Sequence, residues 1–283
     1  MSLAPTKGAL AMALAIEQPT TAPRSAKKRL QLRQLGQRWL PWLVPIVLIG
    51  VWQLAATIGW LSARVLPAPS TILQTTWELL LHQNLLGDIA VSTRRALLGL
   101  AIGGSLGFIF GLLNGTFPTS ERLFDSTFQM IRNIPHLALL PLVILWFGIG
   151  ETSRLFLVAF GVFFPLYLNT YHGVRSIDPN LREMGIVYGL SKWGLFRHII
   201  FPGALPSILV GLRFALGVMW LTLIVAESLA SNAGIGHLTM NAREFMQTDV
   251  LVMGIVIYAL LGKLADTIAR LIERRSLRWR VGA

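Results

Sequence analysis

The sequence predicts an all-α, polytopic integral membrane protein with about six transmembrane helices. Of its 283 residues, 54% are hydrophobic and only 13% are charged, and the mean hydropathy is +0.61. Soluble domains carry about 25% charged residues, so this low charge is typical of a chain that lies in lipid. Several apolar runs approach the roughly 20 residues that a helix needs to cross a bilayer.

The net charge of +12 is concentrated at the two ends of the chain. Residues 1–38 contain seven Lys or Arg and one Glu, and residues 270–283 contain five Arg and one Glu. Basic segments that flank apolar spans are typical of the cytoplasmic side. We therefore expect cytoplasmic N- and C-termini and a lipid partner, with no nucleic acid. The expected organisation is a basic arm (1–38), a transmembrane domain (39–272) and a basic tail (273–283).

The first predicted span covers about residues 39–60, with tryptophans near both ends, where membrane interfaces favour them. After the Pro67-Ala-Pro-Ser70 break, a short helix to about residue 86 is expected along the outer surface. The apolar run 9–16 is an alternative signal-peptide core. Cleavage there would leave the basic arm outside, against the charge rule.

The second predicted span, about residues 92–113, carries a regular stripe of glycines. Small residues at every fourth position share one face of a helix and let two helices approach closely in lipid. The stripe predicts a tight helix–helix contact at Gly99, Gly103, Gly107, Gly111 and Gly115.

The third predicted span, about residues 123–147, is interrupted at Arg132-Asn-Ile-Pro-His136, because Pro135 breaks a helix. Broken helices in a membrane face protein or a water-filled cavity.

Arg94 and Arg95 fall near the outer face in a topology with both termini inside, and they are expected to extend to the interface. The remaining predicted spans are 155–171, 205–229 and 250–268, with a polar outer segment at 231–249.

A polar segment, residues 174–202, separates the fourth and fifth spans on the inner side. Asp178-Pro179 is a helix-start signal, Gly189 can end that helix, and Ser191 can cap a second one that breaks at Pro202. The order of these residues predicts two short helices across the inner face, a shape suited to a groove on a cytoplasmic partner. An ordinary polar loop is the alternative.

The spacing Glu-x-Gly-x-x-x-Gly, nine residues, then Ile-x-Phe-Pro resembles the EAA loop of ABC importer permeases. In that family the loop docks on the ATP-hydrolysing subunit and transmits its closure to the membrane helices. The resemblance therefore implies the type I ABC importer permease fold. It assigns ATPase coupling to Glu183, Met184, Gly185, Gly189, Ile199, Phe201 and Pro202.

The resemblance extends over roughly residues 38–280. Segments 132–149, 214–227, 240–249 and 258–266 are similar to permeases of aliphatic-sulfonate importers, whose relatives include taurine, nitrate and bicarbonate permeases. The resemblance implies a homodimer in the inner membrane with two ATPase subunits and an external solute-binding protein. The implied substrate is an alkanesulfonate, with taurine, nitrate or another small anion as the alternative.

The residues themselves predict no catalytic or metal site. The chain has no Gly-x-x-x-x-Gly-Lys-Ser/Thr loop, no Cys and no metal-spaced pair of His. We therefore expect a transport subunit without a cofactor, with ATP bound by partner subunits. An ion-coupled secondary transporter would need a deep coupling carboxylate and often an inverted repeat, and we find no such repeat.

Polar residues within the spans are candidates for a translocation path, because they are costly in lipid. Arg213, Gly217, Trp220 and Glu227 share one helix face, which is expected to face the interior between subunits, where Arg213 could attract a sulfonate. The alternative is that Arg213 and Glu227 extend to opposite interfaces. Arg132, Asn133 and His136 are path candidates at the break, with helix repair around Pro135 as the alternative for all three.

Overall fold

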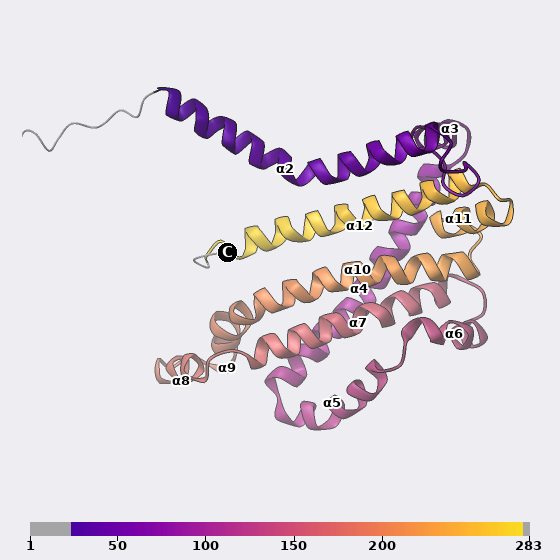
Figure 1. Ribbon diagram of the computed structural model, residues 1–283. Helices are drawn as coiled ribbons and strands as arrows, with labels where there is room; N and C mark the ends of the chain where they lie inside the picture. Colours follow the sequence, from indigo (N-terminus) through magenta and orange to yellow (C-terminus); the bar gives the residue numbers. More distant parts are fainter. Residues whose placement is uncertain (1–23, 280–283) are drawn as a thin grey trace, which may run out of the picture. The chain divides into compact units, whose positions relative to one another are not determined.

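The computed structural model describes residues 24–279, and every regular element among them is a helix (Figure 1). The chain divides into two units, Met1–Ala55 and Ala56–Ala283. The described part of the first unit belongs to α2, which also supplies the first residues of the second unit. The helices are α2 (Arg24–Thr57), α3 (Pro69–His82), α4 (Leu85–Thr116), α5 (Pro118–Arg132), η1 (His136–Leu139), α6 (Leu140–Phe147), α7 (Glu151–Arg175), α8 (Pro179–Val187), α9 (Lys192–Leu195), η2 (Phe196–Ile200), α10 (Phe201–Ala230), α11 (Ile235–Glu244) and α12 (Thr248–Ser276).

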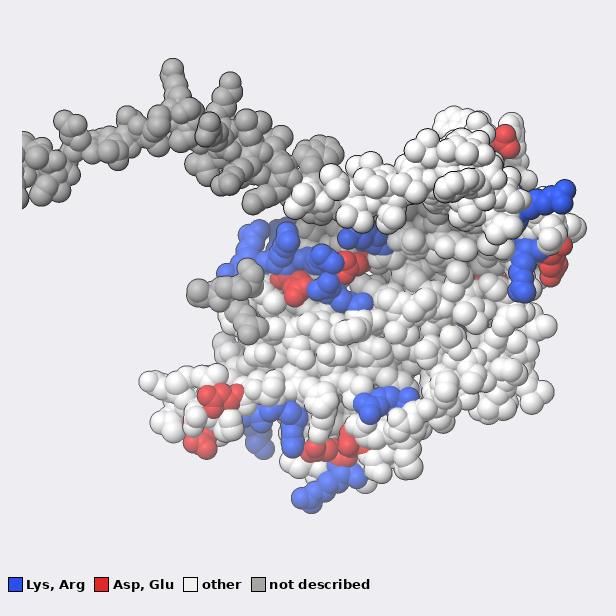
Figure 2. All heavy atoms as spheres, viewed as in Figure 1, with Lys and Arg blue, Asp and Glu red and all other residues white. Residues whose placement is uncertain are grey.

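The long apolar helices correspond to the predicted spans. Helices α4, α7 and α12, and the continuous run from α9 through α10, are each long and apolar enough to cross a membrane. The pair α5 and η1–α6 passes the same test as one bent unit, and α2 contributes the shorter apolar stretch Trp42–Thr57. Together these segments agree with about six crossings. Over the visible face of the second unit, charged side chains gather toward the ends of the long helices and over α5 (Figure 2).

Two boundaries differ from the sequence-based prediction. Helix α2 begins at Arg24, so residues 24–38 of the expected basic arm are helical, while residues 1–23 lie outside the described residues. The outer segment 231–249 contains α11, because Ile235, Gly236, Thr239 and Ala242 form a buried face on it. The sequence had predicted only a polar outer segment there, with no secondary structure assigned to it.

The third span is broken where Pro135 predicts it. Helix α5 ends at Arg132, and η1 starts at His136 after Pro135 in an extended conformation. The two parts meet at an angle of 82°. Tight three-residue turns close part of the backbone there, with Ile134 N donating to Ile131 O at 3.0 Å and Ala138 N to Pro135 O at 2.9 Å.

Helices α4 and α7 form the closest pair in the bundle. A Cβ atom at Gly103 would overlap the carbonyl oxygen of Ala159, and one at Gly111 would lie 2.7 Å from Tyr167 O. The other members of the stripe face Val158, Phe163 and Val174 on α7. This is the tight helix–helix contact that the four-residue spacing predicts.

Helix α10 packs against α7 and completes the central core. Val158 and Val162 of α7 lie in one buried cluster with Met219 and Leu223 of α10. Because α7 runs into the 174–202 loop and α10 leaves it, these two helices connect that loop to the opposite end of the bundle (Figure 1).

Candidate functional site

The 174–202 loop folds as two short helices with the predicted caps. The Asp178 side chain accepts a hydrogen bond from Asn180 N at 2.9 Å and starts α8. Ser191 Oγ accepts from Gly194 N at 3.1 Å and starts α9. Between them, Gly189 has φ +77°, the left-handed conformation that glycine adopts at little cost.

Close packing fixes α8 against the segment that leads into α10. A Cβ atom at Gly185 would lie 2.6 Å from Ile199 Cδ1 and 2.7 Å from Leu195 Cδ1, so a larger residue there would have to displace the ends of both side chains. Ile199 and Phe201 pack against the buried cluster that contains Ile200 and Val174. The second helix does not break at Pro202 as predicted: α9, η2 and α10 form one continuous run, in which Pro202 follows the π-helical turn η2 by two residues.

The solvent-exposed face of the 174–202 loop is unusually apolar. Met184 is 48% exposed, Val187 84%, Tyr188 79% and Trp193 67%. Glu183 is also exposed on α8. Apolar residues exposed together on one short loop are typical of a surface that binds another protein.

The structure corrects the expectation for the Arg213 face of α10, which packs against α12 of the same chain. Arg213 forms ion pairs with Asp266 (3.2 Å) and Glu273 (3.5 Å). Trp220 is 8% exposed, and its ring lies 6.1 Å from that of Tyr258. The helical periodicity of the sequence placed Arg213, Trp220 and Glu227 on one face of α10. It could not predict which helix packs against that face.

Glu227, on the same face, belongs to a buried charge network that the sequence reasoning missed. Arg95 of α4 donates to Glu227 Oε1 at 2.8 Å and, from Nε, to Glu151 Oε2 at 2.8 Å. Its Nη1 also donates to Ala233 O at 2.6 Å. Arg95 is 5% exposed, so it does not extend to the interface as expected. Arg95 and Glu227, charged residues inside two apolar spans, were the signal for such a network.

Glu227 is fully buried and faces three further hydrogen-bond donors. The single Ser92 hydroxyl lies 2.7 Å from its Oε2 and 3.0 Å from its Oε1, Tyr258 OH donates to Oε2 at 2.9 Å, and Gly236 N donates to Oε2 at 3.0 Å. A buried carboxylate is tolerated only when it is paired and hydrogen-bonded in this way. The network therefore ties α4, α7, α10, α11 and α12 together at one end of the bundle.

The same network caps the N-terminus of α11. Asp88 Oδ1 accepts from Gly234 N at 2.7 Å, and Ser92 Oγ accepts from Ile235 N at 2.9 Å. Gly234 has φ +105°, and a Cβ atom there would lie 2.6 Å from Glu227 Oε1. Carboxylates at a helix N-terminus satisfy free N–H groups and the helix dipole, so they fix the position of α11.

At the break in the third span, the three candidates have different surroundings. Arg132 and Asn133 are exposed, and Asn133 Nδ2 donates to Gln129 O at 3.0 Å. His136 Nε2 lies 3.0 Å from Thr222 Oγ1 of α10. His136 thus connects the broken span to α10.

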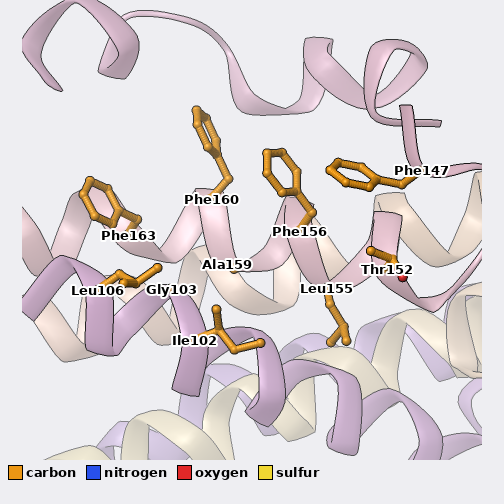
Figure 3. A pocket seen from close by; sticks show the side chains of 10 residues that line it. All are labelled: Ile102, Gly103, Leu106, Phe147, Thr152, Leu155, Phe156, Ala159, Phe160 and Phe163. Carbon is orange, nitrogen blue, oxygen red and sulfur yellow. The ribbon is translucent and has the colours of Figure 1, made fainter. Parts of the chain in front are cut away.

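An apolar pocket of about 410 Å³ lies between α4, α6 and α7. Figure 3 shows the rings of Phe147, Phe156, Phe160 and Phe163 on one side and Ile102 of α4 on the other. Thr152 supplies the hydroxyl group in the wall. The pocket thus offers an apolar surface with no charged side chain.

Comparison with known sequences identifies several similar proteins. Residues 103–278 match the model of the family described as binding-protein-dependent transport system inner membrane component. The chain is 58% identical to SsuC of Escherichia coli (strain K12), a permease protein assigned to aliphatic sulfonate transport, over 86% of this chain and 94% of that protein. It is 42% identical to SsuC of Bacillus subtilis (strain 168), over 93% and 95%. It is 34% identical to the taurine permease TauC of Escherichia coli, over 82% and 86%.

Solved structures show the same fold at low sequence identity. An amino acid ABC transporter crystallised with histidines superimposes with a TM-score of 0.54 at 17% identity, over 68% of this chain and 93% of that chain. The MetNI methionine ABC transporter in an inward-facing conformation gives 0.54 at 16% identity, over 72% and 98%.

Proposed function

Because the chain belongs to the family of binding-protein-dependent transport system inner membrane components, we propose that it is the permease subunit of an ATP-driven importer of aliphatic sulfonates. The proposed substrate rests on one observation: the chain is 58% and 42% identical to aliphatic sulfonate permease proteins of two bacteria. Taurine or nitrate is the second candidate, but the corresponding relatives are only 34% and 27% identical.

We propose that the 174–202 loop couples the chain to its ATPase. Its apolar exposed side chains suit a groove on a partner, and the caps and Gly189 hold them in place. Closure of two partner ATPase subunits would move α8 and α9, and α7 and α10 would transmit that motion by alternating access. The chain has no phosphate-binding loop, so ATP would be bound by the partners and the chain would need no cofactor of its own.

The proposed assembly contains two copies of this chain, two ATPase subunits and an external solute-binding protein in the inner membrane. Both basic termini would lie in the cytoplasm, as the charge bias favours. Arg132 and Asn133, exposed at the break, are the side chains we propose for the translocation path. We do not propose Arg213 for the anion, because it forms ion pairs with Asp266 and Glu273.

The test is uptake of a radiolabelled alkanesulfonate into vesicles that contain the chain with its ATPase and binding protein, with ATP supplied inside. We expect ATP-dependent uptake that resists unlabelled nitrate. ATP-driven uptake of taurine or nitrate in its place would overturn the substrate, and no ATP-driven uptake of any anion would overturn the function.

Coupling through the loop is tested by Gly189→Val. A Cβ atom at Gly189 meets nothing within 4 Å, so the change introduces only backbone strain at φ +77°. We expect uptake to fall at least ten-fold while membrane insertion is retained. Gly194→Ala, in ordinary contact with its neighbours, is the matched control and should transport normally. Normal uptake in Gly189→Val would exclude a coupling role for this turn.

A further inference from the structure

A second pocket, of about 600 Å³, lies where the end of α4 meets the 174–202 loop. This volume is within the roughly 300–1,000 Å³ typical of ligand sites. Leu113 and Phe117 at the end of the membrane-spanning helix form one wall. Trp193 and Phe196 of the loop form another, and Arg182 and Lys192 complete the lining.

The two cations of this pocket lack carboxylate partners. Within residues 24–279, neither Arg182 nor Lys192 forms an ion pair with an acidic side chain. Arg182 donates from Nη2 to the carbonyl oxygen of Val174, but its buried Nε has no acceptor in the described part of the chain. Two positive charges without a carboxylate partner favour an anion in the pocket, and guanidinium and ammonium groups both donate to phosphate oxygens.

The apolar wall indicates where the ligand comes from. Phe117 is 56% exposed and Leu113 37% exposed, although both lie at the end of a membrane-spanning helix. Trp193 is 67% exposed beside them. Tryptophan together with Lys and Arg is typical of the membrane–water interface, and basic pockets between spanning helices bind anionic lipid headgroups.

We propose that this pocket binds an anionic phospholipid. Its phosphate would lie between the Arg182 guanidinium and the Lys192 ammonium, and an acyl chain would lie along Leu113, Phe117 and Trp193. The bound lipid would then connect the end of α4 to α8 and α9. The proposal requires that the chain is a membrane component, but it does not depend on which substrate is imported.

The test is native mass spectrometry of the assembled transporter, titrated with phosphatidylglycerol or with phosphatidylcholine of the same acyl chains. We expect tighter binding of phosphatidylglycerol. Arg182→Gln and Lys192→Gln should each weaken that binding about five-fold, since each Lys or Arg near an anionic lipid adds a similar amount of binding free energy. Arg182→Lys should retain most of it. Arg197→Gln, an exposed charge on the same loop outside the pocket, is the matched control and should bind as the unchanged chain does.

Three outcomes would overturn the proposal. The variants could bind phosphatidylglycerol as well as the unchanged chain, or both lipids could bind equally. Phosphatidylglycerol could also bind the isolated chain but be released when the ATPase subunits assemble, which would make the pocket part of a protein interface. Sulfonate uptake is measured separately, so failure here leaves the proposed function standing.

Discussion

At the scale of single residues, the two carboxylates bound to Arg95 differ in what they contribute. Glu227 is fully buried, whereas the Glu151 side chain is 58% exposed. Removing one member of a buried pair leaves the other charge without compensation, which costs about 3–5 kcal/mol. Glu151 also pairs with the buried Arg154, but its own carboxylate is largely exposed, so its loss leaves no acidic site empty inside the bundle. The loss of Glu227 should therefore cost more than the loss of Glu151.

We expect Glu227→Gln to lower the melting temperature of the purified protein far more than Glu151→Gln. The first change leaves Arg95, Ser92 and Tyr258 directed at a neutral amide in a dry site. The second removes the partner of two buried guanidinium groups, Arg95 and Arg154, but Glu151 itself is largely exposed and its loss leaves Arg95 paired with Glu227. Thermal unfolding of both variants in the same detergent measures the difference. Equal losses would mean that Glu151 contributes as a buried charge does.

Residue partners were predictable only where they are close in sequence. Asp178, Gly189 and Ser191 act within a few residues of themselves, and their caps and turn were predicted correctly. Arg95 meets Glu151 and Glu227 across 56 and 132 residues, a distance over which one sequence carries no geometric signal. For the same reason, the partners of Arg213 on α12 were not foreseen.

At the scale of helices, the glycine stripe determines how close α4 and α7 can be. With no side chains at these positions, the carbonyl oxygens of α7 occupy the space that a Cβ atom would need. Lipid supplies no hydrophobic force between two helices, so this close van der Waals contact is a main source of their attraction. Gly103 is the most restricted member, because a Cβ atom there would approach an α7 carbonyl oxygen, that of Ala159, more closely than at any other position of the stripe.

We expect Gly103→Ala to destabilise the protein by about 1–3 kcal/mol, since the added methyl group forces two helix backbones apart. Gly262→Ala on α12 is the matched control, because a Cβ atom there meets nothing within 4 Å. It should be neutral or slightly stabilising, as alanine favours a helix by about 1 kcal/mol over glycine. Melting temperatures of the two variants decide the matter, and a tolerated Gly103→Ala would contradict the contact.

Hydropathy located the helices but not all of their ends. Four of the six predicted spans lie within α4, α7, α10 and α12, each of which extends beyond its apolar run, whereas the first, residues 39–60, runs past the end of α2 at Thr57. Polar residues continue a helix at little cost once it leaves the lipid, so apolarity marks only its middle. Helix α11 was not predicted, because its buried face combines Ile235 and Ala242 with Gly236 and Thr239 and therefore forms no apolar stripe.

At the scale of the whole second unit, its two ends have different characters. The 174–202 loop lies at one end and α11 at the other, and α7 and α10 extend between them (Figure 1). The loop end presents exposed apolar side chains, whereas the α11 end is held by buried ionic hydrogen bonds. Motion that starts at the loop therefore reaches an end whose helices are fastened to each other.

We expect the outer ends of α4 and α11 to move together during transport. The chain has no cysteine, so spin labels can be placed by Arg94→Cys and Arg243→Cys alone, both at exposed positions. The distance between the labels should be the same in the resting and the ATP-trapped transporter. Adding Glu227→Gln should broaden the distance distribution. A shift between the two states of the unchanged network would show that these ends separate.

The break between α5 and η1 bears on how the third span can respond to that motion. An intact helix must break hydrogen bonds before it bends sharply, and this cost makes it stiff. At residues 133–136 the continuous ladder is already absent, and short local turns hold part of the backbone. The angle between α5 and α6 can therefore change by rotation about a few backbone bonds. A gate built here would open and close without any helix having to melt.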